Sequence, residues 1–172
     1  EDPTHIGVAF DVSRQTFRTE TYADYKAGRS ATPSEFEGQI SLVQEILGAL
    51  RIPFVQVEGY EADDVIATLT TMATAQGMDV LICSGDRDCF QLVSDQVTLL
   101  YPVRGVSEVW RMTPAAVQDK YGVPPSRYSD LAALVGESSD NLPGVPGVGP
   151  KTAAKWIGTY AGLDGIAANI DA

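Results

Sequence analysis

The chain is poor in cysteine, histidine and basic residues, and it has no long apolar run. Its 172 residues include two cysteines and one histidine. Two cysteines do not make a disulfide framework, so we interpret Cys83 and Cys89 as reduced core thiols, which fits a cytoplasmic location. No segment approaches the roughly 18 uncharged apolar residues of a membrane-spanning helix. The polar, acidic segment Glu1–His5 is not that of a signal peptide.

The shortage of basic residues limits how the chain can bind polyanions. Twelve Lys and Arg stand against 23 Asp and Glu, which gives a net charge of −11. This charge argues against nonspecific binding of nucleic acid over the whole surface. A nucleic-acid enzyme with this composition needs local basic patches and bound cations; two divalent ions would change −11 to −7 (−11 + 4).

Carboxylates are abundant, and they gather where apolar runs end. The acids that follow the runs 6–10, 54–60, 80–85 and 131–134 are, in order, Asp11; Glu61, Asp63 and Asp64; Asp86 and Asp88; and Glu137 and Asp140. Eight carboxylates in one crevice would repel each other strongly unless cations held them. Because hard divalent ions such as Mg²⁺ prefer oxygen ligands, the pattern indicates a hard-metal site.

Apolar runs alternate with helical patterns along the first two thirds of the chain. We expect strands at 6–10, 54–57, 80–83 and 97–101, and helices at 33–50, 61–75 and 89–93. Thr32 is the expected N-cap of the first helix, with Glu35 at its third position. The alternation predicts an α/β fold with a mostly parallel sheet and helices on both faces. Ligands of such sheets bind at the carboxyl ends of the strands, where the acids lie.

The alternation of strands and helices ends after Tyr101. A hairpin at 103–111 is followed by expected helices from Thr113 to Tyr121 and from Lys151 to Tyr160, with Gly and Pro turns between the segments. We therefore divide the chain into an α/β catalytic core, residues 1–112, and a helical region, residues 113–172. The length suits one domain with a small appendage.

Each acidic motif has an ordinary alternative. The three acids in 61–64 could be helix caps that complement the macrodipole, and we weigh capping and metal binding evenly. The segment Ser84-Gly-Asp-Arg-Asp88 could be a plain turn. It also fits the DxD motif of haloacid-type phosphatases and of several transferases.

The most specific local signal is a glycine-rich turn between two helices. Gly144, Gly147 and Gly149 let backbone approach backbone or phosphate closely. The next helix starts near Lys151 and Thr152, whose N–H groups, with the charges of Lys151 and Lys155, suit a DNA phosphate. We favour DNA-backbone binding over a simple helix-helix turn.

Basic and aromatic residues alternate earlier in the chain. Arg18 follows Phe17, and Tyr22, Tyr25, Lys26 and Arg29 come next. Rings that stack bases and cations that bind phosphates suit a single strand or an unpaired end. A solvated loop with aromatic anchors explains the same residues equally well.

Three motifs together carry a family resemblance. The segments Gly59–Val65, Ser84–Asp88 and Ser139–Gly149 occur in the order and spacing of the 5′ nuclease family. The chain resembles these flap endonucleases and phage 5′-exonucleases over its whole length, and most of all the 5′→3′ exonuclease domains of bacterial, actinobacterial-type, DNA polymerase I. The resemblance implies a PIN-like or Rossmann-like fold with a helix-hairpin-helix. It also implies cleavage of DNA at 5′ flaps, nicks and free 5′ ends, dependent on two or more Mg²⁺ or Mn²⁺ ions.

The resemblance also implies roles for individual residues. The acidic positions of the family fall on Asp11, Glu61, Asp63, Asp64, Asp86, Asp88 and Asp140. We expect Glu61, Asp63 and Asp86 in an inner metal set, Asp88, Asp140 and Glu137 in a second set, and Asp11 and Asp64 acting through waters. Tyr25, Lys26 and Arg29 match the arch that grips the 5′ strand, where the two cations would stabilise phosphate charge, and Arg18 matches a basic residue before it. The segment from Gly144 to Lys151 matches the hairpin that holds duplex DNA and that can bind K⁺ in relatives.

The sequence departs from the family in two places. Members begin with a strand that ends in an Asp, and the sequence given starts after that point, so we expect one strand and one metal ligand to be absent. Glu137 stands where the family usually has Asp. A catalytically incomplete DNA-binding fragment is therefore the first alternative, and a DxD small-molecule phosphatase is the second. For either nucleic-acid interpretation we expect a monomer in the bacterial cytoplasm, associated with the nucleoid, with a covalently following polymerase domain as a candidate partner.

Overall fold

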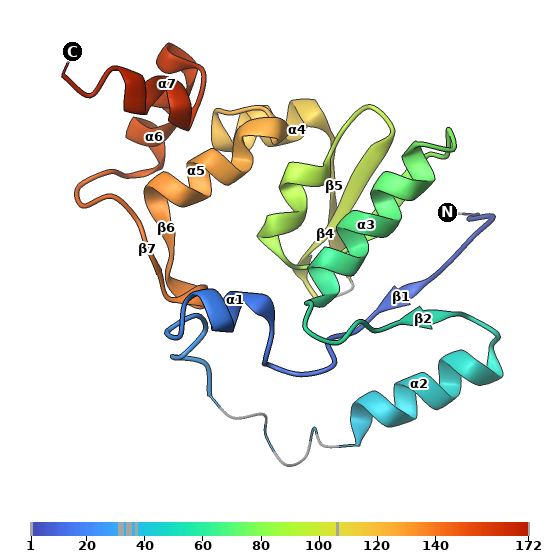
Figure 1. Cartoon of the computed structure of the whole chain (residues 1–172). Coiled ribbons are helices and arrows are strands. Elements are labelled where there is room, and N and C mark those ends of the chain that lie inside the picture. The colour runs from blue at the N-terminus through green and yellow to red at the C-terminus, as the bar shows by residue number, and fades with distance from the viewer. Residues whose placement is uncertain (1, 31–32, 34–35, 37, 106, 172) are drawn as a thin grey trace. The chain divides into compact units, whose positions relative to one another are not determined.

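The structure is a computed structural model that describes residues 2–30, 33, 36, 38–105 and 107–171. The chain divides into two compact units, an N-terminal unit of residues 1–66 and a C-terminal unit of residues 67–172. Helix α3 (Ala62–Thr74) carries the chain from one to the other (Figure 1). Each unit is described by itself.

The N-terminal unit contains a short parallel strand pair. Strands β1 (Val8–Ala9) and β2 (Phe54–Val55) align Val8 with Phe54 and Ala9 with Val55. The Phe10 ring meets the Phe54 ring edge-on, with centroids 5.9 Å apart. Both strands form where the apolar runs predict them, but the ladder covers only two residue pairs.

Among the described residues between these strands, two segments form α-helices. Helix α1 (Phe17–Thr21) falls in the segment of alternating basic and aromatic residues, and helix α2 spans Gln39–Ala49. The helix predicted at 33–50 corresponds to α2, and its predicted start at Pro33 is wrong. Gly38 is the N-cap instead, at φ 85°, a left-handed conformation that suits glycine. The expected capping residues Thr32 and Glu35 lie outside the described residues.

The C-terminal unit is built on a three-stranded mixed sheet. Strand β3 (Val80–Cys83) runs parallel to β4 (Val97–Arg104). Strand β4 forms a hairpin with antiparallel β5 (Glu108–Met112), as Figure 1 shows. Ile82, Leu99 and Met112 lie opposite one another across the three strands and are all buried. The core of this unit therefore rests on one face of the sheet.

The fold class is the predicted α/β class, with a difference in the sheets. Both β1–β2 and β3–β4 pair in parallel, as the alternation of strands and helices predicts. Strand β5 is antiparallel because a short hairpin connection can only return the chain antiparallel to itself. Among the described residues the strands form three sheets, β1–β2, β3–β4–β5 and β6–β7, in place of the single sheet expected.

Two predictions about buried side chains are wrong. Cys83 is exposed, because side chains alternate along β3 and only Ile82 faces the core; Cys89 is buried, and both thiols are free. The helical spacing of apolar residues in 61–75 predicts that Val65, Ile66, Leu69 and Met72 share the inner face of that helix; on α3 Val65 is buried, but Leu69 and Met72 are exposed by 41% and 56%.

Short helices and one small hairpin complete the C-terminal unit. The elements that follow β3 and β5 are η2 (Arg87–Leu92), α4 (Pro114–Tyr121), η3 (Pro125–Arg127), α5 (Tyr128–Val135), β6 (Gly136–Glu137), η4 (Ser138–Asp140), β7 (Leu142–Pro143), α6 (Pro150–Tyr160) and α7 (Leu163–Ala168). Helices α4 and α6 begin within one residue of their predicted starts. None of the described helices has the length and apolarity needed to cross a membrane.

Candidate metal centre and nucleic-acid interface

In the N-terminal unit, the start of α3 is capped by carboxylates. The Asp11 Oδ1 atom accepts the Ala62 N–H at 2.6 Å, and Asp64 Oδ2 accepts the Glu61 N–H at 2.9 Å. These acceptors satisfy two of the N–H groups that every helix leaves free at its N-terminus. Capping, the ordinary alternative for the acids of 61–64, is therefore realised for Asp64, and Asp11 caps the same helix although no capping role was predicted for it.

Asp64 also forms a two-pronged ion pair. Arg18 donates from Nη1 and Nη2 to its two carboxylate oxygens at 2.7 and 2.8 Å. This hydrogen bonding lowers the pKa of Asp64 and raises the pKa of Arg18. Arg18, which was predicted to contact DNA, thus binds a predicted metal ligand, and planar guanidinium-carboxylate pairs of this kind are geometrically specific.

Glu61 is a buried carboxylate with two partners of its own. The Lys26 Nζ atom lies 2.9 Å from both Glu61 oxygens, and the Tyr25 hydroxyl donates to Oε2 at 3.1 Å. Lys26 adopts a left-handed backbone conformation at φ 55°, and Tyr25 is itself buried. The structure therefore joins Glu61 to two residues that were assigned to the 5′ strand of DNA.

The remaining predicted residues of this unit are more accessible. Tyr22 and Arg29 are exposed, and Asp63 on the first turn of α3 is half-buried. The structure brings Arg18, Tyr25 and Lys26 together around Glu61 and Asp64. Binding of DNA or metal by these residues stays a prediction.

In the C-terminal unit, a turn after β3 orients the second acidic motif. The Ser84 Oγ atom accepts the Asp86 N–H at 3.0 Å, and Asp86 Oδ1 accepts the Asp88 N–H at 2.9 Å as the N-cap of η2. The turn interpretation of this segment is thus correct for its local geometry. It is also what directs Asp88, two residues further on, toward other acids.

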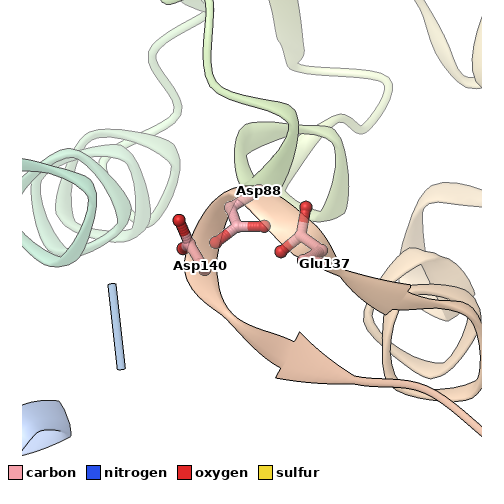
Figure 2. Close-up of side chains that lie close together, drawn as sticks. All are labelled: Asp88, Glu137 and Asp140. Atoms are coloured by element: carbon pink, nitrogen blue, oxygen red, sulfur yellow. The ribbon is translucent and has the colours of Figure 1, made fainter. Parts of the chain in front are cut away.

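Asp88 meets two carboxylates from the β6–β7 hairpin. One side-chain oxygen each of Asp88, Glu137 and Asp140 lies within 4.8 Å of the others (Figure 2). Glu137 ends β6, and Asp140 ends the 3-10 turn η4, so the two come from either end of the same short connection. Figure 2 shows all three carboxylates converging although Asp88 comes from a distant part of the sequence.

The crowding of these acids changes the protonation of Glu137. Burial raises the pKa of Glu137 to about 7, and the neighbouring charges of Asp88, Asp140 and Asp86 and a hydrogen bond to Asp88 act in the same direction. At neutral pH the group thus retains a proton part of the time. A bound cation would favour the charged form of a carboxyl group that holds a proton because it is buried beside other carboxylates.

The donor set fits a divalent cation. The three residues offer oxygen atoms alone, Asp140 is buried, and Asp88 and Glu137 are half-buried. Hard ions such as Mg²⁺ and Mn²⁺ prefer such oxygen ligands. We call Asp88, Glu137 and Asp140 the carboxylate triad; Asp86 acts on it through its charge and through the N-cap of η2.

A small cavity of about 240 Å³ adjoins the triad. Its lining includes Asp88 and Glu137 together with Gln91, Tyr128 and Ser129. The sequence motifs did not indicate the last three residues. Tyr128 packs against Phe90 with ring centroids 5.1 Å apart, and burial raises the pKa of its hydroxyl. A Tyr at the first turn of a helix is common, so no sequence signal marks it.

The glycine-rich turn leads into helix α6 as predicted. Gly149 is the N-cap and Pro150 the first helical residue, so Lys151 and Thr152 occupy the first turn. Lys151 and Lys155 are exposed and lie four residues apart, which places them on one face of the helix. Gly147 at φ 80° and Gly149 have open space where a Cβ atom would lie, whereas Gly144 has none.

Comparison with known proteins defines the class. Residues 1–122 match the family described as 5′-3′ exonuclease, N-terminal resolvase-like domain, and residues 123–172 match 5′-3′ exonuclease, C-terminal SAM fold. Together with the fold and the carboxylates, these matches define a 5′-3′ exonuclease domain. The chain belongs to this family.

The curated relatives are longer proteins than this chain. Over all 172 residues the chain is 60% identical to DNA polymerase I of Mycobacterium tuberculosis (strain ATCC 25618 / H37Rv). It is 43% identical over 171 residues to DNA polymerase I of Bacillus subtilis (strain 168). The chain spans about a fifth of the length of these relatives, 19% in each case.

Solved structures share the fold. T5 5′-exonuclease with bound zinc superposes with a TM-score of 0.81 at 21% identity, over 98% of this chain and 65% of that one. The catalytic core of Rad2 in complex with DNA superposes with a TM-score of 0.61 at 21% identity, over 93% of this chain and 48% of that one. The predicted fold class is therefore confirmed.

Proposed function

We propose that this 5′-3′ exonuclease domain hydrolyses DNA phosphodiester bonds at 5′ flaps, nicks and free 5′ ends with the help of Mg²⁺ or Mn²⁺. The observation that carries the proposal is the carboxylate triad, whose oxygens lie within 4.8 Å of one another in a chain of this family. The zinc of T5 5′-exonuclease and the DNA of the Rad2 complex are consistent with the same chemistry.

The triad is the best-defined cation site of the proposal. Asp88, Asp140 and Glu137 would hold one divalent ion through their carboxylate oxygens. Glu61, Asp63 and Asp86 stay proposed metal ligands, with Asp11 and Asp64 acting through waters. Two divalent ions would supply an activated water and charge stabilisation of the leaving oxygen. Asp86 has a second duty, because its N-cap bond to the Asp88 N–H orients that ligand.

Residues of the N-terminal unit would bind the 5′ strand. Arg29 and Tyr22 are exposed and suit a phosphate and a base. Lys26 and Arg18 now neutralise Glu61 and Asp64 at 2.9 and 2.7 Å. We propose that Lys26 and Arg29 stabilise the phosphate charge in the reaction. Tyr25 holds the Glu61 carboxylate in place through its hydroxyl.

Duplex DNA would bind at the start of α6. The N–H groups of Lys151 and Thr152 lie in the first turn of that helix, where free N–H groups and the helix dipole favour a phosphate. Lys151 and Lys155 add two exposed positive charges to this surface. Carbonyl groups of the turn from Gly144 to Gly149 are the proposed ligands of a K⁺ ion.

The wider context is also proposed. The identity to mycobacterial DNA polymerase I suggests that a polymerase domain accompanies this one and that primer removal in replication and repair is its task. We propose a monomer in the bacterial cytoplasm near the nucleoid. Within it, residues 1–112 form the catalytic core, and residues 113–172 grip the duplex while contributing Glu137 and Asp140.

Cleavage of a labelled 5′-flap substrate with Mg²⁺ tests the proposal. The assay uses this chain and an N-terminally extended form, with Asp140→Asn as the variant that lacks one triad carboxylate. We expect Mg²⁺-dependent cutting near the flap junction and loss of cutting in Asp140→Asn with duplex binding retained. Binding without cutting by either form would favour the DNA-binding fragment. Turnover of phosphate monoesters that a Lys151→Ala change leaves untouched would favour the phosphatase.

A further inference from the structure

The hairpin that carries two triad residues is closed by a tight backbone crossing. Gly136 pairs with Pro143 across β6 and β7, and the Val145 N–H donates to the Leu134 carbonyl at 2.8 Å. A Cβ atom on Gly144 would overlap the Val135 carbonyl, and one on Gly136, at φ 81°, would overlap the Gly144 backbone. We call Gly136 and Gly144 the glycine clasp. Only glycine allows two backbones to approach this closely.

The glycines after the clasp lie in a different environment. At Gly147 and Gly149 no heavy atom lies within 4 Å of the position that a Cβ atom would take, whereas at Gly144 that space is filled by protein backbone. Approach of a DNA backbone explains open glycines at Gly147 and Gly149. It does not explain Gly144, which the sequence pattern grouped with them. The requirement for glycine at 144 is internal to the protein.

Helix α5 links the clasp to all three triad residues. At its first turn, Tyr128 packs on Phe90 of η2, the element that carries Asp88. At its last turn, the Leu134 carbonyl accepts the Val145 N–H, and the Val135 carbonyl packs against Gly144. Glu137 follows Gly136 directly, and the connection to Leu142 turns back through Asn141 at φ 58°. One helix therefore fixes the Asp88 side and the Glu137–Asp140 side of the triad.

We propose that the glycine clasp is a positioning device that aligns Glu137 and Asp140 with Asp88 for cation binding. The inference rests on the proposed function of the triad. It reassigns Gly144 from contact with DNA to placement of metal ligands. The clasp also precedes the turn Val145–Val148, closed by a 3.0 Å hydrogen bond, that leads into α6, so it sets where the duplex-binding turn begins.

Mn²⁺ affinity, measured by electron paramagnetic resonance without DNA, tests the clasp. Gly144→Ala and Gly136→Ala should each weaken Mn²⁺ binding about tenfold or more, as loss of groups that orient metal ligands does elsewhere. Gly77→Ala is the matched control for Gly136→Ala, because Gly77 has φ 77° and open space around its Cβ position, so it carries the backbone strain without the overlap. Gly144→Ala with wild-type Mn²⁺ affinity would overturn the inference.

Amide exchange of the wild-type chain keeps the test decisive if a clasp variant does not fold. Linkage requires that an ion which binds the aligned triad also stabilises the clasp. Mg²⁺ should therefore slow exchange of the Val145 N–H more than that of Val148, and equal rates with and without Mg²⁺ at Val145 would overturn the inference. Glu137→Gln separates the two proposals. If Glu137→Gln does not weaken Mn²⁺ binding, the triad is refuted as a cation site. If Glu137→Gln weakens Mn²⁺ binding but the two glycine changes do not, only the positioning role of the clasp is refuted.

Discussion

Replacing Glu137 by Gln should change how the stability of the metal-free chain depends on pH. In the folded chain the pKa of Glu137 is about 7, against an ordinary value of 4.5, because burial and neighbouring carboxylates favour the protonated form. Between these values the folded state binds more protons than the unfolded state. Stability contributed by this group is therefore present below about pH 4.5 and is lost as pH rises through about 7.

The size of the effect follows from the two pKa values. A rise from 4.5 to about 7 corresponds to an upper limit of about 3 kcal/mol in the free energy of unfolding. Because Glu137 is only half-buried, solvent screening reduces this to about 1–2 kcal/mol. Gln keeps nearly the same shape and carries no charge. The free energy of unfolding of Glu137→Gln, relative to that of the wild type, should therefore increase by about 1–2 kcal/mol as pH rises from about 5 to about 8.

Urea unfolding in EDTA at the two pH values provides the assay. Both tryptophans, Trp110 and Trp156, lie in the C-terminal unit, so their fluorescence reports on the unit that contains Glu137. Other acids titrate as well, and the difference between variant and wild type removes their shared contribution. If that difference is the same at both pH values, the Glu137 carboxyl is not held in a charge-crowded site and the prediction is refuted.

Three further predictions concern other predicted residues. Asp86→Ala should abolish cleavage and reduce the Mn²⁺ affinity of the carboxylate triad about tenfold, whereas Asp86→Asn, which keeps the N-cap bond to Asp88, should retain most of the Mn²⁺ affinity of the triad; paired electron paramagnetic resonance and flap assays check this. Lys151→Ala should weaken duplex binding and reduce the slope of log K against log salt by about one, measured by fluorescence anisotropy, and an unchanged slope would remove Lys151 from the contact surface. Arg18→Met should destabilise the start of α3 by about 1 kcal/mol at neutral pH, which faster amide exchange at Glu61 would show. Because Arg18 lowers the pKa of Asp64, the difference in exchange between variant and wild type should shrink as pH falls below about 4. A difference that stays constant with pH would contradict the ion pair.

Local sequence signals predicted the regular elements well. Strand β3 occupies the predicted residues, and helix α4 starts at Pro114 with the Thr113 side chain accepting the Ala116 N–H at 3.3 Å. A β-branched run and a capping residue act over a few positions, so they can be recognised in the sequence alone. The parallel pairing of β3 with β4 also followed from the elements between them.

The errors arise where structure depends on more distant residues. Nothing near Cys83 in the sequence shows that its side of β3 is left uncovered, and the start of α2 depends on the backbone conformation of Gly38. The Arg18–Asp64 pair joins residues 46 positions apart, and the Gly144 packing depends on the course of α5. Sequence reasoning identified the acids as a group, but only the fold shows that Asp88, Glu137 and Asp140 meet.

The central claim is that the carboxylate triad holds a divalent ion on which DNA cleavage depends. The most direct test measures Mn²⁺ binding by electron paramagnetic resonance and Mn²⁺-dependent cleavage of a 5′ flap in the same samples of wild-type and Asp140→Asn protein. We predict that the wild type binds Mn²⁺ and cuts the flap, and that Asp140→Asn loses both activities while still binding duplex DNA. Wild-type Mn²⁺ affinity or wild-type cleavage in Asp140→Asn would contradict the claim.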